Sequence, residues 1–463
     1  MPQNDPPADE ASHPVFDTDE SESAYRSRRS GGNRDTGWKR RWQLRVPSRW
    51  EPLWPLGVAG TAAGNIGRHW RAERRTITVG LSAFTIAALA GLVAGFVLAS
   101  ITGTLEAYPG FILLVPAAIG VRGNIFGAMG SRLGSALRLG TFELSFERGG
   151  VLRHNLSAVS LLTLVESAFI GVAAYAIQVG LSRPTMTIWD FLTIAVVGGV
   201  ITSVIVGCAT VGVAWLAVRF DWDLDSVVAP IITLIGDTAG IPVLAVVAAV
   251  LAGRGSVTLG VAVVCLVVAV LALVAGFTRL FDAAKRIFVE SLPVLAVVAV
   301  VDLFAGAVIE GNLDTLISYS VFLIVLPAFL SASGGLGSMF VCRLGSKIHL
   351  GTVEPHIVPG AVALLDSTLV YLYGIVIFPV MALLAAGIGA LTGAGSPGVV
   401  GVVEVTVLAG ALASTIALLV GYYTALVSAR AGLDPDNHGI PAVTSSMDFF
   451  GVIVLAFALL VVT

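Results

Sequence analysis

Charged residues are scarce in this sequence. Asp, Glu, Lys and Arg make up 12% of its 463 residues, whereas an ordinary soluble domain carries roughly 25%. Hydrophobic residues make up 56% of the chain, and its mean hydropathy is +0.90. This balance excludes a soluble globular protein. We therefore expect a polytopic membrane protein surrounded by membrane lipids, with no nucleic-acid partner.

Cysteine is also rare, and the sequence has no clusters of soft metal ligands. The three cysteines, Cys208, Cys265 and Cys342, lie in or beside apolar runs, lack metal-ligand spacing and cannot form a paired framework. We interpret them as buried, inert thiols. No His or Cys cluster suits zinc or copper, and we expect no cofactor.

The first 74 residues lack the apolar periodicity of the rest. Their composition cannot bury enough apolar area to offset chain entropy, so residues 1–74 are predicted to be a largely disordered cytoplasmic tail, with 1–37 disordered. No signal peptide is recognisable. Residues 38–54 read WKRRWQLRVPSRWEPLW, which is typical of a segment on a membrane surface. We interpret it as a juxtamembrane anchor, with a regulatory, lipid-contacting role as the alternative.

Long apolar runs dominate the remainder. A hydrocarbon layer about 30 Å thick needs roughly 20 apolar residues per helix, and eleven runs meet this requirement. The expected spans are 76–101, 109–136, 154–180, 188–218, 228–251, 256–278, 287–309, 316–347, 357–390, 399–429 and 438–462. Most Lys and Arg then fall on the side of the tail, which predicts a cytoplasmic N-terminus, a C-terminus outside and a location in the cell membrane.

An internal repeat with an offset of 211 residues organises these spans. Arg132 matches Arg343, Gly95 matches Gly306, and LGT at 139–141 recurs at 350–352. The sequence predicts an all-α fold with two five-helix repeats, 75–252 and 285–463, joined by a connecting helix within 253–284. Five spans leave the chain on the opposite side of the membrane, and the connecting span returns it, so that both repeats cross the membrane in the same sense. The repeats can therefore pair about a pseudo-twofold axis along the membrane normal, as a fused dimer that functions as a monomer.

The same offset relates two polar stretches inside apolar spans. DSVVAPIITLIGD, from Asp225, and DNHGIPAVTSSMD, from Asp436, share an aspartate, a proline, a threonine and a final aspartate. Intramembrane acids usually face a cavity, a partner or an ion. The final acids, Asp237 and Asp448, are the predicted cation ligands, and the preceding Thr233 and Thr444 add oxygen atoms of the kind that Mg²⁺ prefers. Asp225 and Asp436 are secondary candidates at the cytoplasmic mouth. The alternative is a pair of structural, hydrogen-bonded acids.

The second span of each repeat is rich in glycine. VPAAIGVRGNIFGAMGSRLGSALRLGT begins at Val115, and its counterpart LPAFLSASGGLGSMFVCRLGSKIHLGT begins at Leu326. Such glycines allow either close helix packing, which we favour for the individual residues, or an unwound segment that exposes carbonyls to an aqueous path. Asn124 is a further ion-path candidate.

These motifs resemble a known family. PAAIGVRGN followed by SRLGSAL, with the later P-x-x-T-x-x-x-D pattern, is similar to the MgtE and solute carrier 41 families of magnesium transporters over residues 75–462. The resemblance implies that Asp237 and Asp448 match the pore aspartate, and that the fused repeats form the pore alone. The sequence has no stretch long enough for the soluble regulatory domains of bacterial MgtE. The second signature also departs from the first, because Ser333 stands where the first has Arg122.

Unmatched polar residues distinguish the halves. Glu166 corresponds to Ile377, and we hypothesise that Glu166 pairs with Arg122, since both would be costly alone in the membrane. Glu166 is also a secondary ion-path candidate. Asp302 and Asp366 occur only in the second half. Each is either an ion-path or coupling-ion ligand, or a structural acid.

We conclude that the sequence encodes a divalent cation transporter or channel, with Mg²⁺ as the favoured ion, and not an enzyme. A Na⁺- or H⁺-coupled Mg²⁺ exchanger or exporter is the main alternative. An intramembrane aspartyl protease, with two acids sharing a proton, is a remote one. A structural or receptor protein would leave the paired acids without a purpose.

Overall fold

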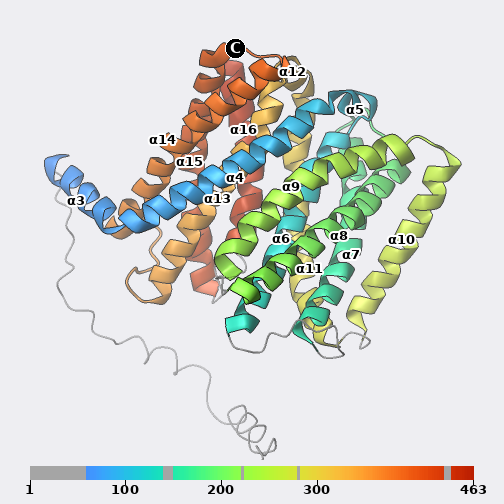
Figure 1. The fold of residues 1–463 in the computed structure, drawn as a ribbon, viewed down its shortest axis with the longest axis horizontal. Helices are drawn as coiled ribbons and strands as arrows, with labels where there is room; N and C mark the ends of the chain where they lie inside the picture. Colours follow the sequence, from blue (N-terminus) through green and yellow to red (C-terminus); the bar gives the residue numbers. More distant parts are fainter. Residues whose placement is uncertain (1–58, 139–149, 221–223, 279–281, 432–438) are drawn as a thin grey trace, which may run out of the picture. The chain divides into compact units, whose positions relative to one another are not determined.

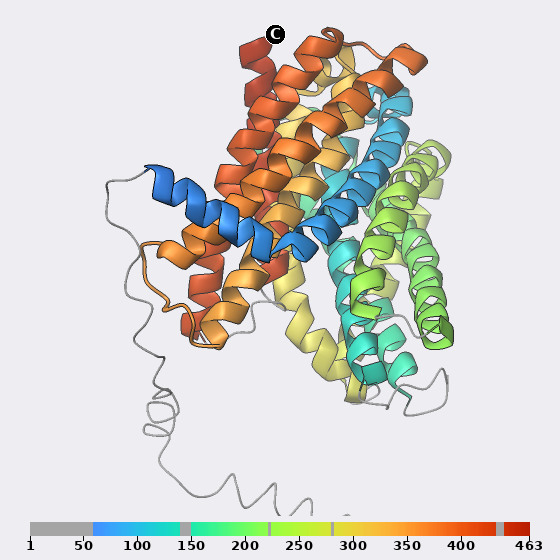
Figure 2. The ribbon, with the colours of Figure 1, turned by 60° about the vertical axis from the view of Figure 1, so that its left-hand side comes forward.

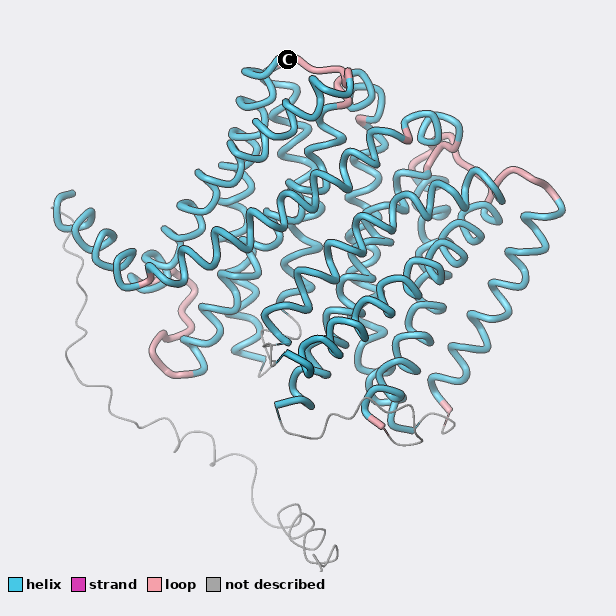
Figure 3. The backbone as a smooth tube through the Cα atoms, viewed as in Figure 1, coloured by secondary structure: helices cyan, strands magenta, loops and turns pink. Residues whose placement is uncertain are grey.

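Helices form all the regular secondary structure in the residues that the structure describes. The computed structural model describes residues 59–138, 150–220, 224–278, 282–431 and 439–463, and those ranges hold no strand (Figure 3). The predicted all-α fold is therefore confirmed for them. The helices are α3 (Ala59–Ala72), α4 (Arg74–Ser100), α5 (Thr102–Ala107), α6 (Phe111–Arg138), α7 (Val151–Gly180), α8 (Ile188–Phe220), α9 (Leu224–Leu251), α10 (Ser256–Phe277), α11 (Asp282–Gly311), α12 (Leu313–Ser318), α13 (Val321–His349), α14 (Ala361–Thr392), α15 (Gly398–Ala431) and α16 (Ile440–Val462).

Every expected span coincides with one long helix. Ten of these helices are long and apolar enough to cross a membrane, which supports a multi-pass membrane protein. In α9, only Ile235–Leu251 is assessed, as a shorter apolar helix, so the eleventh crossing stays a prediction. The span expected to begin at residue 316 begins at Val321, because the preceding residues form the separate short helix α12.

Helix α10 lies at one edge of the bundle (Figure 1). Its buried Ala262, Cys265 and Ala269 recur at three- and four-residue spacing and pack against α7 and α8. Small side chains of this kind let helices approach closely in a membrane. The helix returns from the end of the bundle near α5 to the opposite end (Figure 1), so α4 and α11 begin at the same end.

The thiols are less uniformly buried than expected. Cys265 is buried, but Cys342 is half-buried and Cys208 is exposed. The expectation of three buried thiols was therefore wrong, because an apolar run predicts membrane depth without saying which helix face meets the lipid.

The first helix of each repeat packs on the other repeat. Helix α4 lies along α13, and α11 lies along α6. A Cβ built at Gly95 would lie 2.0 Å from the carbonyl oxygen of Ile324, and one at Gly306 would lie 2.6 Å from that of Leu113. The offset of 211 relates Gly95 to Gly306 and Leu113 to Ile324. These two glycines therefore allow the same backbone contact at two equivalent places.

Helix α3 was not expected. It lies within the part of the chain predicted to be a largely disordered tail, and the chain bends between α3 and α4 (Figure 2). The remainder of that tail, residues 1–58, lies outside the described residues, as does the proposed anchor at 38–54.

Replacing Gly95 or Gly306 by alanine should destabilise the protein, although alanine favours helices. The added methyl group meets a backbone carbonyl that cannot move without its helix, and overpacking of this kind costs about 1–3 kcal/mol. Thermal unfolding in detergent measures the effect. Gly260→Ala on the exposed face of α10, where nothing lies within 4 Å, is the matched control and should leave the unfolding temperature unchanged. Equal stability of all three variants would contradict the proposed contact.

Candidate functional site

The two aspartates related by the repeat lie close together in the structure. Asp237 is carried by α9 and is 8% exposed, while Asp448 is carried by α16 and is half-buried. Their carboxylates are near enough for the charges to repel each other. Two residues far apart in the sequence are thus within electrostatic range of each other inside the helix bundle.

A third carboxylate joins this pair. Asp302 on α11 is fully buried, lies beside the hydroxyl of Ser445 and is close enough to Asp448 for mutual repulsion. Neither of its oxygens has a hydrogen bond of good geometry. A Cβ built at Gly120 would lie 2.4 Å from Oδ2 of Asp302. The absence of a side chain at Gly120 on α6 therefore makes room for the carboxylate.

The structure also describes the side chains of two further predicted site residues, Thr444 and Asn124. Thr444 lies one turn before Asp448, and its hydroxyl donates to the carbonyls of Ile440 and Pro441 at 3.0 and 3.1 Å. Its hydroxyl hydrogen is thus used within the helix, and oxygen lone pairs remain. Asn124 is half-buried on α6. The side chains of Asp225 and Thr233, and the whole of Asp436, lie outside the described residues.

The donor set around Asp237, Asp302 and Asp448 suits a hard cation. No ion pair joins any of the three to a basic side chain in the described ranges. The described residues also contain no group of three or more His, Cys, Asp or Glu arranged to hold a metal ion directly. Carboxylate oxygens are ligands of the kind that hard divalent cations take.

Comparison with known families agrees with this donor set. A family model described as MgtE, divalent cation transporter, matches residues 115–247 and again residues 326–458. Both matched segments are related by the offset of 211 residues, and together they cover more than half of the chain. The chain belongs to the MgtE family of divalent cation transporters. Searches of curated proteins and of solved structures gave no match.

This family assignment has two immediate consequences. The chain is a membrane transporter of divalent cations and not an enzyme, which removes the protease alternative. The match occurs twice within one chain, and each matched segment ends beyond one of the paired aspartates, Asp237 and Asp448. The internal repeat is therefore a duplication of the family's membrane domain.

The predicted pair of Arg122 and Glu166 is not formed. Arg122 is buried, donates to the carbonyl of Ala118 and points toward Gly199 on α8. Both carboxylate oxygens of Glu166 on α7 are buried without a hydrogen-bond partner. The hypothesis was wrong because neighbouring spans do not fix which faces meet, and a buried, unpartnered carboxyl group is costly.

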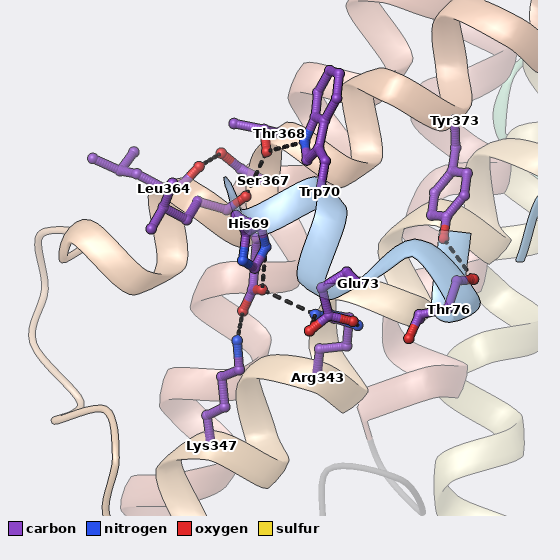
Figure 4. Close-up of polar contacts among 12 residues, drawn as sticks. His69, Trp70, Glu73, Thr76, Arg343, Lys347, Leu364, Ser367, Thr368 and Tyr373 are labelled. Carbon is purple, nitrogen blue, oxygen red and sulfur yellow. Dashed lines mark hydrogen bonds and ion pairs between the residues drawn. The ribbon is translucent and has the colours of Figure 1, made fainter. Parts of the chain in front are cut away.

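Asp366 lies in a different polar cluster, at the start of α14. Its carboxylate accepts from Arg343 at 3.2 Å and from Lys347 at 2.5 Å, both on α13. His69 of α3 lies 3.6 Å from the same carboxylate, and Glu73 forms a two-pronged contact with Arg343 at 3.1 and 3.4 Å (Figure 4). Two basic side chains therefore surround one buried acid and hold α3.

Two neutral contacts strengthen this attachment. The indole Nε1 of Trp70 donates to the Thr368 hydroxyl at 3.0 Å, and the Tyr373 hydroxyl donates to the carbonyl of Thr76 at 3.1 Å (Figure 4). The first repeat has a counterpart of the central pair in which an uncharged amide replaces the carboxylate. There, Arg132 donates to Asn155 at 2.9 Å, and these residues match Arg343 and Asp366 by the offset. One Asn-to-Asp difference, with a lysine nearby, creates the cluster in one half only.

Sequence reasoning missed the roles of several residues in both clusters. Ser445 gave no signal. Gly120 lies in the glycine-rich stretch for which close packing was predicted, but the sequence did not indicate that Asp302 is the side chain packed against it. The cluster around Asp366 was more accessible, since Arg343 and the unmatched Asp366 were both recognised. Their meeting was not predicted, because the spacing alone does not bring α3 to α13.

Asp366→Asn should weaken the attachment of α3. The substitution leaves Lys347 without its anion and Arg343 with Glu73 as its remaining acidic partner. Removing one partner of a fully buried pair costs about 3–5 kcal/mol, and the cost here should be smaller because both basic side chains are partly exposed. Hydrogen exchange should rise in 59–72, and the unfolding temperature should fall. Asp314→Asn, at an exposed position, is the control. Unchanged exchange in 59–72 would contradict this role.

Acidification should release α3. The hydrogen bond from Arg343 lowers the pKa of Glu73 below its ordinary value. A carboxylate with a lowered pKa stabilises the folded state above its ordinary pKa, and this stabilisation is lost as the pH falls through the lowered value. Hydrogen exchange in 59–72 should therefore increase in acid. Glu73→Gln should already exchange faster at neutral pH and respond less to acid, whereas an equal response would exclude Glu73 as a contributor.

Proposed function

We propose that this protein carries a divalent cation, with Mg²⁺ favoured, across the cell membrane through a path between its two repeats. Asp237 and Asp448 bind the cation from opposite repeats. The observation that carries the proposal is the meeting of these two acids, which the duplication makes equivalent and which the fold brings within electrostatic reach. Thr233 and Thr444 supply further oxygens from the preceding turn.

The proposed layout is two five-helix repeats with α10 as the connecting helix and a pseudo-twofold axis along the membrane normal. The equivalent contacts at Gly95 and Gly306 support it, because a symmetric pair of repeats must make each cross-contact twice. The N-terminus is cytoplasmic and the C-terminus outside. One chain contains both halves of the site and functions as a monomer.

The energetics favour a divalent ion. A carboxylate at membrane depth costs at least a few kcal/mol, and a second nearby carboxylate adds repulsion. A cation between Asp237 and Asp448 removes both costs. A cation that retains part of its water shell also needs few direct protein ligands, in keeping with the two carboxylates from α9 and α16.

A second candidate function is Mg²⁺ exchange coupled to H⁺ or Na⁺. Asp302 favours it, because a third carboxylate beside Asp448 has no counterpart in the first repeat, where Gly91 stands. A carboxylate next to the cation site can take up a proton or a monovalent ion when the divalent ion leaves. Such competition would link the two fluxes.

Asp237→Asn and Asp448→Asn should each lower Mg²⁺ flux into liposomes by about tenfold or more, since a loss of 1.4 kcal/mol in binding changes affinity tenfold. The double variant should show almost no flux. A fluorescent Mg²⁺ indicator inside the liposomes gives the rate, and size-exclusion chromatography checks folding. Asp314→Asn should transport normally. A folded double variant with wild-type flux would refute the proposed site.

Imposed gradients should distinguish exchange from passive flow. If Asp302 couples the fluxes, an H⁺ or Na⁺ gradient should accelerate Mg²⁺ flux in the wild-type protein, and Asp302→Asn should abolish the acceleration while passive flux remains. If Mg²⁺ flux in the wild-type protein does not change with either gradient, coupled exchange is excluded and passive flow is supported.

A further inference from the structure

A groove runs between α7 and α8 over one half of their length. It has a volume of about 710 Å³, within the range of pockets that hold small molecules, and its lining is predominantly apolar. Phe126 of α6 forms part of its floor, and Trp215 lies near one end. Three hydroxyl-bearing residues line it. Thr163 donates to Ser203 at 3.2 Å, and Ser160 donates to the carbonyl of Leu156 at 2.8 Å. The interior therefore offers an apolar ligand no competing charge.

Small residues create this groove. Ser160, Gly207 and Gly212 line it in the first repeat, and the offset of 211 places Tyr371, Leu418 and Tyr423 at the equivalent positions of the second. Adding a Cβ at Gly212 would meet nothing within 4 Å. The groove in the first half is therefore lined by small residues at positions where the second half has bulky side chains.

Two exposed arginines lie beyond the same end of the groove, on the helix faces that line it. Arg153 lies three residues before Leu156 on α7, and Arg219 lies four residues after Trp215 on α8. Residues three and four apart share a helix face. Each arginine therefore lies on the same face of its helix as the residues that line the groove. The second repeat lacks this pair. Leu364 replaces Arg153, and Arg430, which replaces Arg219, donates to the carbonyl of Pro355.

We propose that the groove binds an anionic phospholipid. An acyl chain lies between α7 and α8, and the phosphate group is held by Arg153 and Arg219. Apolar ligands at this depth come from the bilayer, because α7 and α8 are both membrane-spanning by length and composition. Basic side chains at the end of such a groove select an anionic headgroup, since guanidinium groups match phosphate geometry. The inference is independent of the cation site.

Native mass spectrometry of the full chain in detergent tests the proposal, with phosphatidylglycerol and phosphatidylcholine as probes. The wild-type protein should retain phosphatidylglycerol preferentially. Gly212→Tyr fills the groove with the residue found in the other repeat and should reduce retention of both lipids by about tenfold. Gly260→Tyr, at another helical glycine with nothing within 4 Å, is the matched control and should bind as the wild type does. Equal retention in both variants would overturn the proposal.

The headgroup assignment has its own test. Arg153→Gln combined with Arg219→Gln should reduce the preference for phosphatidylglycerol roughly tenfold while phosphatidylcholine is still retained. Arg254→Gln, an exposed arginine elsewhere, should leave the preference unchanged. An unchanged preference in the double variant would show that these arginines do not hold the phosphate.

A measurement on the unaltered protein avoids any folding defect. Cys208 is exposed and lines the groove, so phosphatidylglycerol should slow its alkylation by N-ethylmaleimide in a saturable way. Peptide mass spectrometry reads the rate, with half-buried Cys342 as an internal reference. An alkylation rate of Cys208 that does not depend on phosphatidylglycerol would overturn the proposal. Protection of Cys208 that depends on self-association of the chain, and not on the lipid, would overturn it as well.

Discussion

The placement of three carboxylates without basic partners is the constraint on which the rest of this structure depends. Asp237, Asp302 and Asp448 come from three helices, and the described residues give none of them an ion pair. Acids at membrane depth are costly, so the fold must hold them against their mutual repulsion. The close backbone contacts between α4 and α13 and between α11 and α6 fix the helices against one another, and the proposed cation offsets the repulsion.

Duplication within one chain lets the two halves diverge around this shared centre. A homodimer must make the same change on both sides of its axis, but a fused pair need not. Asp302 has Gly91 as its counterpart. The Arg343–Asp366 ion pair has as its counterpart the Arg132–Asn155 hydrogen bond, whose acceptor is an uncharged amide. The paired aspartates are identical in both halves, while the polar residues around them differ.

The sequence predicted what periodicity and self-similarity encode. Apolar runs located every long helix, and the offset of 211 linked Asp237 to Asp448 before any contact was known. It did not predict which helix faces meet, so the expected pair of Arg122 and Glu166 was wrong. Helix α3 was missed for a related reason, because its contacts through His69 and Trp70 join it to residues distant in the sequence.

Helix α13 reaches from the attachment of α3 to the proposed cation site. Near its end, Arg343 contacts both Asp366 and Glu73. Further along the same helix, Gly334 packs on the backbone of Thr444, since a Cβ there would lie 3.4 Å from the Thr444 Cα. Thr444 is one turn from Asp448. Helix α13 therefore contacts both the cluster around Asp366 and the segment that carries one of the two paired acids.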